Sequence, residues 1–336
     1  MATPTATRTP EESGAAGGFN PMHWIRGQMQ QFLAFVSLIV IVVFFSFASP
    51  NFLTASNLTG ILVASVTIGL LALGTTAVII TGGIDLSIGT AMILSGVMTG
   101  VFLVHWNLPL WVGVIGGVLF GAFIGLVNGL VISYLGIPPF IATLAMMLVT
   151  IGAALVISGT EPIRFTSVPG FSDIANASLV SGARVPFSVV LLALMAVIAG
   201  FVLAKTKMGR YAYAIGSNEE ATRLSGVDVR SWKVAIYTFS GVFVGLAGVL
   251  AAARLNSAQP TGGQGLELEA IAAVVIGGTS LAGGRGTITG TVIGILIMSV
   301  LTNGLRIMSI PQEWQSIAVG AVILVAVYID IVRKRT

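Results

Sequence analysis

One carboxylate stands alone in a long apolar part of the sequence. Asp85 is the only Asp, Glu, Lys or Arg residue between Arg26 and Glu161. It follows the pair Gly82–Gly83, and paired glycines interrupt a helix where irregular backbone is tolerated only beside protein or a water-filled cavity. A carboxylate there either lines or gates a route, or it caps the helix that begins at Ser87, with the Ser87 hydroxyl helping. We favour the cap as its immediate bond, and a cap at a broken helix can still shape a route.

A second feature is the charged loop Lys205–Lys233. Ser217 and Glu220 have the spacing of an S-x-x-E capping box, acidic residues favour the positive end of a helix, and Gly226 suits a left-handed stop. The pattern predicts a helix of about two turns over Ser217–Ser225, outside the membrane. Since so short a helix is unstable alone, it docks either on the protein's own span ends or on a partner to which it carries motion. The candidate contact residues are Ser217, Asn218, Glu219, Glu220, Arg223 and Gly226.

Enzyme chemistry has little to work with in this sequence. The chain has no cysteine, and its two histidines are His23 and His105. The glycine-rich run Gly277–Gly286 holds Arg285, but the Gly-Lys-Ser/Thr of a phosphate loop occurs nowhere in the chain. We expect a re-entrant turn there instead. We therefore expect no catalytic residue, no metal site and no cofactor held by this chain.

Uncharged polar residues within the apolar runs are a third group of candidates. A neutral polyol needs hydroxyl and amide partners, not charges. The same residue types also tie membrane helices together, which is their commoner role. For a translocation path we name Gly82, Gly83, Asp85, Ser87, Asn128 and Asn303. Further polar positions are Thr75, Thr76, Thr143, Thr150, Thr302 and Gln315.

Composition places these residues in a lipid bilayer. Hydrophobic residues make up 55% of the 336 residues and charged residues 8%, against about 25% charged in soluble domains. We expect an all-α membrane protein of about ten transmembrane helices with broken or re-entrant segments, each full span needing about 20 residues. The eighth predicted span is too short to cross as a regular helix. The predicted spans are Gln31–Ala48, Leu58–Ile80, Ser87–Val104, Trp111–Tyr134, Pro139–Ile157, Pro186–Ala204, Trp232–Ala253, Glu269–Leu281, Gly286–Ile307 and Glu313–Ile331.

The charges also predict orientation. Residues 1–28 have the composition of a disordered cytoplasmic tail, and residues 29–336 form one transmembrane domain whose charged loop is 205–233. With the amino terminus inside, 12 of the 16 Lys and Arg residues fall in inside segments, which is the positive-inside pattern. Ten spans then return the carboxyl terminus to the inside. Membrane lipids explain the net charge of +4 without nucleic acid.

A short internal similarity suggests a repeat. Ile79–Gly83 and Val274–Gly278 both end in a glycine pair, and the two pairs are 195 positions apart. Five spans separate equivalent points, and an odd number inverts the second half relative to the first. We therefore expect an inverted five-plus-five repeat, with chance similarity in a glycine-rich chain as the rival explanation.

Three sequence blocks resemble the permeases of ribose-type sugar importers, which belong to the ABC transporters. The blocks are Thr81–Gly89, Gly209–Gly226 and Glu269–Thr287, and the resemblance covers nearly the whole chain past about residue 30. It implies a multi-pass permease of the bacterial inner membrane with three partners: a cytoplasmic ATP-binding subunit that holds the ATP, a periplasmic or extracellular sugar-binding protein, and a second permease chain that completes the route as a homodimer. It also implies that Ser217–Ser225 is the coupling helix on the ATPase, although Thr222 stands where the family's Glu-Ala-Ala loop has its second Ala. The implied cargo is a pentose, a hexose or a related polyol.

Two functions remain open at this point. The favoured one is the permease subunit of an ATP-driven, binding-protein-dependent importer of a small sugar, working by alternating access with both termini cytoplasmic. The alternative is an ion-coupled secondary transporter of a small polar solute, which inverted repeats and broken helices suit equally well. That alternative needs carboxylates in the membrane as ion sites, and only Asp85 qualifies well. A channel is disfavoured because no ring of like charges and no filter motif occurs.

Overall fold

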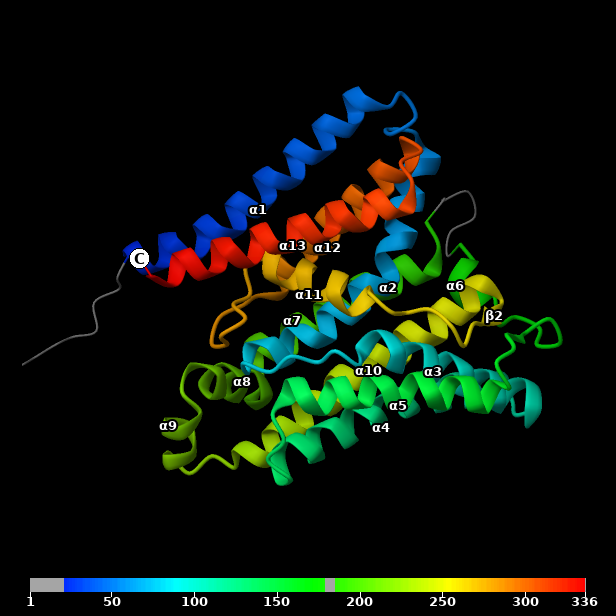
Figure 1. The fold of residues 1–336 in the computed structure, drawn as a ribbon, viewed down its shortest axis with the longest axis horizontal. Helices are drawn as coiled ribbons and strands as arrows, with labels where there is room; N and C mark the ends of the chain where they lie inside the picture. The colour runs from blue at the N-terminus through cyan, green and yellow to red at the C-terminus, as the bar shows by residue number, and fades with distance from the viewer. Residues whose placement is uncertain (1–20, 179–184, 336) are drawn as a thin grey trace, which may run out of the picture.

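The computed structural model describes residues 21–178 and 185–335, and this part of the chain is almost entirely helical (Figure 1). The two short strands pair antiparallel, with Ile163 opposite Ala258 and Arg164 opposite Ser257. The all-α membrane architecture is confirmed. The elements in chain order are α1 (Pro21–Ala48), α2 (Ala55–Ile80), α3 (Ile88–Gly100), the π-helical turn η1 (Val101–His105), α4 (Leu110–Tyr134), α5 (Pro139–Ser158), β1 (Ile163–Arg164), α6 (Asp173–Asn176), α7 (Phe187–Lys205), α8 (Lys207–Ser217), α9 (Glu219–Leu224), α10 (Val229–Leu255), β2 (Ser257–Ala258), α11 (Leu266–Ile276), α12 (Ile288–Ile307) and α13 (Gln312–Arg335).

Each predicted span overlaps one helix, except that Ser87–Val104 covers both α3 and η1, and Glu269–Leu281 runs past the end of α11 at Ile276. Within the described residues, eight helices are long and apolar enough to cross a membrane. The eighth predicted span is α11, whose 11 residues reach about 16 Å, roughly half of the hydrocarbon core. The tenth is α13, whose apolar part is Gln312–Tyr328. Helix α1 begins at Pro21, so residues 21–28, which we placed in the tail, are helical, while residues 1–20 lie outside the described part.

Local sequence explains several helix ends. Pro109, Pro138 and Pro186 each directly precede a helix, where the missing N–H costs least. The Thr54 hydroxyl accepts a backbone N–H in the first turn of α2, as an N-cap does. Helix α5 ends at Gly159, whose φ of 65° is left-handed and is the usual conformation after a helix.

Helices α2, α3 and α10 form the centre of the bundle. In the most apolar 18-residue window, 83% of α2 and 72% of α3 are buried inside the protein, against 11% of α1 and 17% of α7. The outer helices therefore turn apolar side chains toward lipid. Helix α4 packs closely along α10 through glycines: a Cβ at Gly121 would overlap the backbone of Gly245, and a Cβ at Gly125 would overlap the Tyr237 carbonyl. Such backbone contact is typical of membrane helices.

The bundle repeats as two sets of five helices. Helices α1 to α5 correspond in order to α7, α10, α11, α12 and α13. The first residues of α3 and α11, Ile88 and Leu266, are 178 positions apart, and so are the first residues of α4 and α12, Leu110 and Ile288. Equivalent helices also have equivalent neighbours: α10 packs on α3 as α2 packs on α11, and α3 packs on α4 and α5 as α11 packs on α12 and α13.

The second set is inverted relative to the first. Helix α2 ends against Gly216 in α8, and α10 begins beside α9, so that equivalent helices run in opposite directions (Figure 1). The inverted repeat is therefore present, but the predicted register of 195 is wrong. The pair Gly82–Gly83 follows α2, whereas Gly277–Gly278 follows α11, and these helices are not equivalent. The similarity of the two glycine pairs is not what relates the two halves.

Candidate functional site

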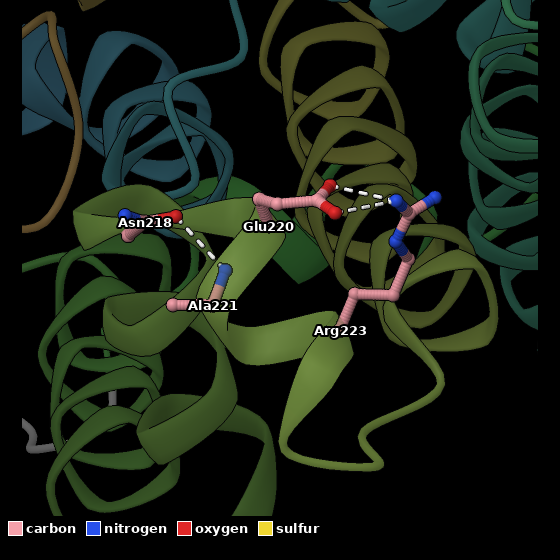
Figure 2. A network of polar contacts seen from close by, with 4 residues as sticks. All are labelled: Asn218, Glu220, Ala221 and Arg223. Atoms are coloured by element: carbon pink, nitrogen blue, oxygen red, sulfur yellow. Dashed lines mark hydrogen bonds and ion pairs between the residues drawn. The ribbon is translucent and has the colours of Figure 1, made fainter.

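Helices α8 and α9 correct the predicted cap. Ser217 is the last residue of α8, and α9 covers only Glu219–Leu224. The N-cap of α9 is Asn218, whose side-chain oxygen accepts the N–H of Ala221 at 2.9 Å (Figure 2). The capping box of Ser217 with Glu220 is therefore wrong. Asn is as good an N-cap residue as Ser. Ser217 belongs instead to α8, a helix that the sequence did not predict.

Glu220 pairs with Arg223 instead of reaching back to a cap. Both carboxylate oxygens of Glu220 lie 2.7 Å from one Arg223 guanidinium nitrogen (Figure 2). The hydrogen bond and the charge of Glu220 raise the pKa of Arg223 above its usual value. The two side chains are 63% and 66% exposed, and a pair so exposed adds little stability. The pair fixes the shape of the outer face of α9 more than it stabilises the fold.

Helix α9 is tied to the start of α10. Lys233 on α10 donates to the Glu219 carboxylate at 2.7 Å. Asp228 caps α10 by accepting the N–H of Ser231 at 3.3 Å and the Ser231 hydroxyl at 2.5 Å. These two bonds hold the pKa of the Asp228 carboxyl below its ordinary value. The position of α9 therefore follows the inner end of α10.

Helix α9 projects from the bundle. Leu224, near its end, is 79% exposed, and α9 lies at one corner of the molecule beyond the membrane helices (Figure 1). Gly226 has a φ of 83°, the left-handed stop that the sequence predicts. An apolar side chain flanked by charged ones on a protruding helix is a surface suited to a protein partner.

The end of α8 is wedged between two other segments. A Cβ at Gly216 would overlap the Ile80 carbonyl oxygen and lie 2.5 Å from the Gly284 nitrogen. A Cβ at Gly283 would lie 2.8 Å from the Gly82 nitrogen. The Gly284 N–H donates to the Ile80 carbonyl at 2.8 Å. We call Ile80, Gly82, Gly216, Gly283 and Gly284 the glycine junction. It joins the ends of α2 and α8 to the α11–α12 turn, backbone against backbone.

Tyr213 adds a side-chain contact to the glycine junction. Its hydroxyl donates to the Gly286 carbonyl at 2.7 Å, so α8 docks on the glycine-rich run that forms the α11–α12 turn. The sequence left open whether this segment docks on the protein's own span ends or on a partner, and the structure contains one helix suited to each. Helix α8 packs on the protein's own span ends, and α9 keeps an exposed face.

Asp85 is held by its neighbours and is 3% exposed. One carboxylate oxygen accepts the Ser87 N–H at 2.9 Å and the Ser87 hydroxyl at 2.6 Å. The Asn128 amide of α4 donates to Ser87 Oγ at 2.9 Å and lies 3.4 Å from the other Asp85 oxygen. Ser87 precedes α3 and makes no cap bond to it, so Asp85 closes the turn before α3 and does not cap the helix itself. Three predicted path residues do come together here.

Two further helices fix the break between α2 and α3. The Thr143 hydroxyl of α5 accepts the Leu86 N–H at 3.1 Å and lies 3.2 Å from the Ile84 carbonyl oxygen. A Cβ at Gly83 would lie 2.5 Å from the Tyr237 hydroxyl of α10. Helices α4, α5 and α10 therefore hold this break from three directions.

The equivalent break between α10 and α11 contains a carboxylate that sequence reasoning missed. Glu267 lies in the first turn of α11 and is 7% exposed. Its Oε1 accepts the Gly265 N–H at 2.9 Å, whereas its Oε2 is buried and has no hydrogen-bond partner among the described residues. A Cβ at Gly89 of α3 would overlap the Gly263 carbonyl oxygen and lie 2.5 Å from Oε2. The sequence did offer one signal for this site, because Glu267 lies just before the eighth predicted span, which is too short to cross the membrane.

Asn303 lies in another part of the bundle. The next residue, Gly304, packs against the ring of Phe45 in α1, and the Asn303 Oδ1 is buried without a hydrogen-bond partner in the described structure. The structure therefore groups Asp85, Ser87 and Asn128 but leaves Asn303 beside α1. Within the described residues, no group of three His, Cys, Asp or Glu side chains could hold a metal ion.

Comparisons with known proteins agree with this architecture. Residues 57–327 match the family model described as "Branched-chain amino acid transport system / permease component". The chain is 41% identical over 301 residues to the ribose import permease protein of Escherichia coli K12, covering 88% of this chain and 92% of that protein. It is 42% identical over 311 residues to the ribose import permease protein of Bacillus subtilis 168 (92% and 95% covered) and 38% identical over 320 residues to the fructose import permease protein of Rhizobium meliloti (90% and 88%). No solved structure matches.

Proposed function

The chain belongs to the branched-chain amino acid transport system permease family, together with the sugar import permeases, and from this premise we propose its role. It is the inner-membrane permease subunit of a binding-protein-dependent importer, and its cargo is a small sugar. A separate cytoplasmic subunit binds and hydrolyses ATP, and the permease alternates between outward-open and inward-open states. The observation that carries the proposal is the exposed, capped helix α9, joined through α8 to the end of α2 and to the α11–α12 turn.

The choice of sugar over amino acid follows from the relatives. The family model is named for branched-chain amino acids, but the relatives that cover about nine tenths of the chain are named for ribose and fructose. We therefore propose a small sugar as the cargo.

The ATP-binding subunit docks on α9 in this proposal. Leu224 and the Glu220–Arg223 pair form its exposed surface. Because Gly216 at the end of α8 contacts the backbone of Ile80 and Gly284, a displacement of α9 reaches α2 and the α11–α12 turn with little slack. We assign the coupling role to Asn218, Glu219, Glu220, Arg223 and Gly226, with Ser217 as part of α8.

The sugar-binding protein docks at the opposite end of the bundle. There β1 pairs with β2, and the buried rings of Phe165 and Phe171 stack with centroids 4.0 Å apart. This packing gives residues 163–176 a compact surface on which the binding protein docks in this proposal. The orientation follows the positive-inside pattern, with both termini and α9 cytoplasmic. Two copies of the chain in a lipid bilayer complete the route.

A proline at Gly226 tests the coupling role. Gly226 has a φ of 83°, which proline cannot adopt, so Gly226→Pro displaces the end of α9 without touching the membrane helices. We expect normal membrane insertion, weak co-purification of the ATP-binding subunit, and sugar uptake reduced by about tenfold or more in proteoliposomes. Gly136→Ala is the matched control, since Gly136 also has a positive φ and a Cβ there meets nothing within 4 Å. Wild-type uptake by Gly226→Pro would refute the coupling role.

A further inference from the structure

The free carboxylate oxygen of Glu267 is the feature that the proposed function leaves unexplained. Buried charged groups in proteins are almost always paired or fully hydrogen-bonded. Asp85 follows this rule in the same bundle, with bonds from Ser87 and Asn128. Glu267 does not, because Oε1 has the Gly265 N–H and Oε2 has nothing among the described residues. Because this oxygen is buried and unbonded in the present state, we expect it to accept a hydrogen bond in another conformational state of the protein.

Glu267 lies near the middle of the membrane. Helix α11 ends at the turn that enters the glycine junction, where α2 also ends. From that level α2 extends over 26 residues, about 39 Å, whereas α11 rises only 11 residues, about 16 Å. Glu267 stands at the far end of α11. It is therefore buried at about half the length of the helix that crosses the whole bilayer.

The two halves of the repeat meet at this point. Glu267 is the second residue of α11, and Gly89 is the second residue of α3. They are equivalent positions, and they contact each other, since a Cβ at Gly89 would lie 2.5 Å from Glu267 Oε2. Gly263 lies on the other side, against the Gly89 carbonyl. The first turns of both half-helices thus face one another with only glycines between them and the carboxylate.

The charges around Glu267 Oε2 indicate which class of ligand can bind there. Two helix N-termini bring partial positive charge, which disfavours a metal cation, and the carboxylate disfavours an anion. A neutral O–H group satisfies Oε2 by donating to it and leaves this balance unchanged, and bonds to a carboxylate are among the stronger hydrogen bonds. The glycines at 89 and 263 let the half-helices close over the oxygen when the ligand is absent.

We propose that the Glu267 carboxylate accepts a hydroxyl group of the transported sugar at the midpoint of the route, once α3 and α11 separate along the Gly89–Gly263 contact. In the present structure this contact is closed. The inference rests on the proposed function, because it takes a sugar as the cargo. It adds a contact residue that belongs to the membrane subunit itself, apart from the selection made by the binding protein.

The test uses the complete importer in proteoliposomes with internal ATP and labelled D-ribose, or D-fructose if the wild type does not take up D-ribose. Glu267→Gln keeps the shape of the side chain and an acceptor for the Gly265 N–H but removes the charge. We expect its maximal uptake rate to fall about tenfold or more, with the thermal midpoint and the ATPase rate stimulated by binding protein unchanged. Glu269→Gln is the control, because it removes the same charge from α11, and its uptake should stay within about twofold.

A series of monodeoxy sugars separates contact from shape. One deoxy derivative should be transported more slowly than the parent sugar by the wild type, and Glu267→Gln should transport the two at equal rates, because the missing hydroxyl and the missing charge are one interaction. Glu267→Asp, which keeps the charge, should recover part of the rate if Glu267→Gln does not fold. Unchanged uptake by Glu267→Gln, or equal losses in Glu267→Gln and Glu269→Gln, overturns the inference. A wild type that transports no sugar at all overturns the proposed function instead.

Discussion

The two breaks in the bundle have equivalent places in the fold but opposite construction. Between α2 and α3, the backbone is bonded to the Thr143 side chain of α5, and Asp85 is bonded on both oxygens, one of them to the Asn128 amide of α4. Between α10 and α11, the chain passes through Gly262, Gly263 and Gly265, all with positive φ, and Glu267 keeps one oxygen free. The first break also contains a left-handed glycine, Gly82, but its hydrogen bonds to α4 and α5 fix it in the bundle. The second break, with three such glycines, leaves more room for movement.

This difference assigns separate tasks to the two halves. Helix α3 is joined to α4 and α5 by the bonds of Asn128 and Thr143 at the break before it, and it packs on α10. Helix α11 leads into the turn that contains Gly283 and Gly284, which press on the end of α8. Because Asn128 and Thr143 also hold the break before α3, we expect a partner that moves α9 to displace α11 more than α3. The contact between Gly89 and Glu267 is where that relative movement would open the route.

The largest effect should come from filling the glycine junction. Gly216→Ala puts a methyl group onto the Ile80 carbonyl oxygen, which forces α8 away from α2 and should abolish uptake while ATPase activity persists. Gly60→Ala and Gly152→Ala are matched controls, because a Cβ at either position meets nothing within 4 Å. Uptake and ATP hydrolysis are measured together in proteoliposomes. Coupled, wild-type rates in Gly216→Ala would show that the junction does not transmit movement.

Removing the two carboxylates should destabilise the protein to different extents. Asp85→Ala leaves the Ser87 N–H and the Ser87 hydroxyl without their acceptor and removes one of the two bonds of the Asn128 amide. We therefore expect a loss of about 3 kcal/mol or more in free energy of unfolding. Glu267→Ala frees only the Gly265 N–H, and we expect a loss of about 1 kcal/mol. Thermal denaturation in detergent measures both. Equal losses would mean that the two breaks are equally fixed.

A smaller effect should follow from loosening the first break alone. Thr143→Val removes the acceptor of the Leu86 N–H and should cost about 1–2 kcal/mol of stability, the penalty for one unsatisfied group. Thr302→Val is the control, because the Thr302 hydroxyl bonds only carbonyl groups of its own helix. Denaturation midpoints of the two variants decide the matter. A midpoint for Thr143→Val as high as that of Thr302→Val would argue against a clamp by α5.

The smallest effect concerns the exposed connection between α9 and α10. The Asp228 carboxyl has a pKa below its ordinary value because Ser231 donates two bonds to it. A lowered folded pKa stabilises the fold above the unfolded pKa of about 3.9, and this contribution is lost as the pH falls through the folded pKa. Amide exchange at Ser231 should therefore accelerate, relative to the intrinsic rate, on acidification below about pH 4. Asp228→Asn should lack this acceleration, and the same acceleration in that variant would exclude the cap as its cause.

The sequence predicted the features that depend on local chemistry. Long apolar runs and the prolines before α4, α5 and α7 located the spans, and the left-handed Gly226 was foreseen. The cap of α9 was misplaced by one residue, because Ser217 is held in α8 by contacts with Gly284 that no local pattern contains. The correct register of the repeat and the buried position of Glu267 were not predicted for the same reason. Both are defined by which helices pack together, and short sequence similarity does not record that packing.

We propose that this permease moves sugar only with energy supplied by a separate ATPase. The direct measurement is uptake of labelled D-ribose and D-fructose into proteoliposomes that contain the chain with its binding protein, with and without the ATP-binding subunit, under imposed sodium or proton gradients. We expect uptake when the ATP-binding subunit and ATP are present, and none from either gradient alone. Uptake driven by a gradient in the absence of that subunit would refute ATP-driven import and establish an ion-coupled transporter.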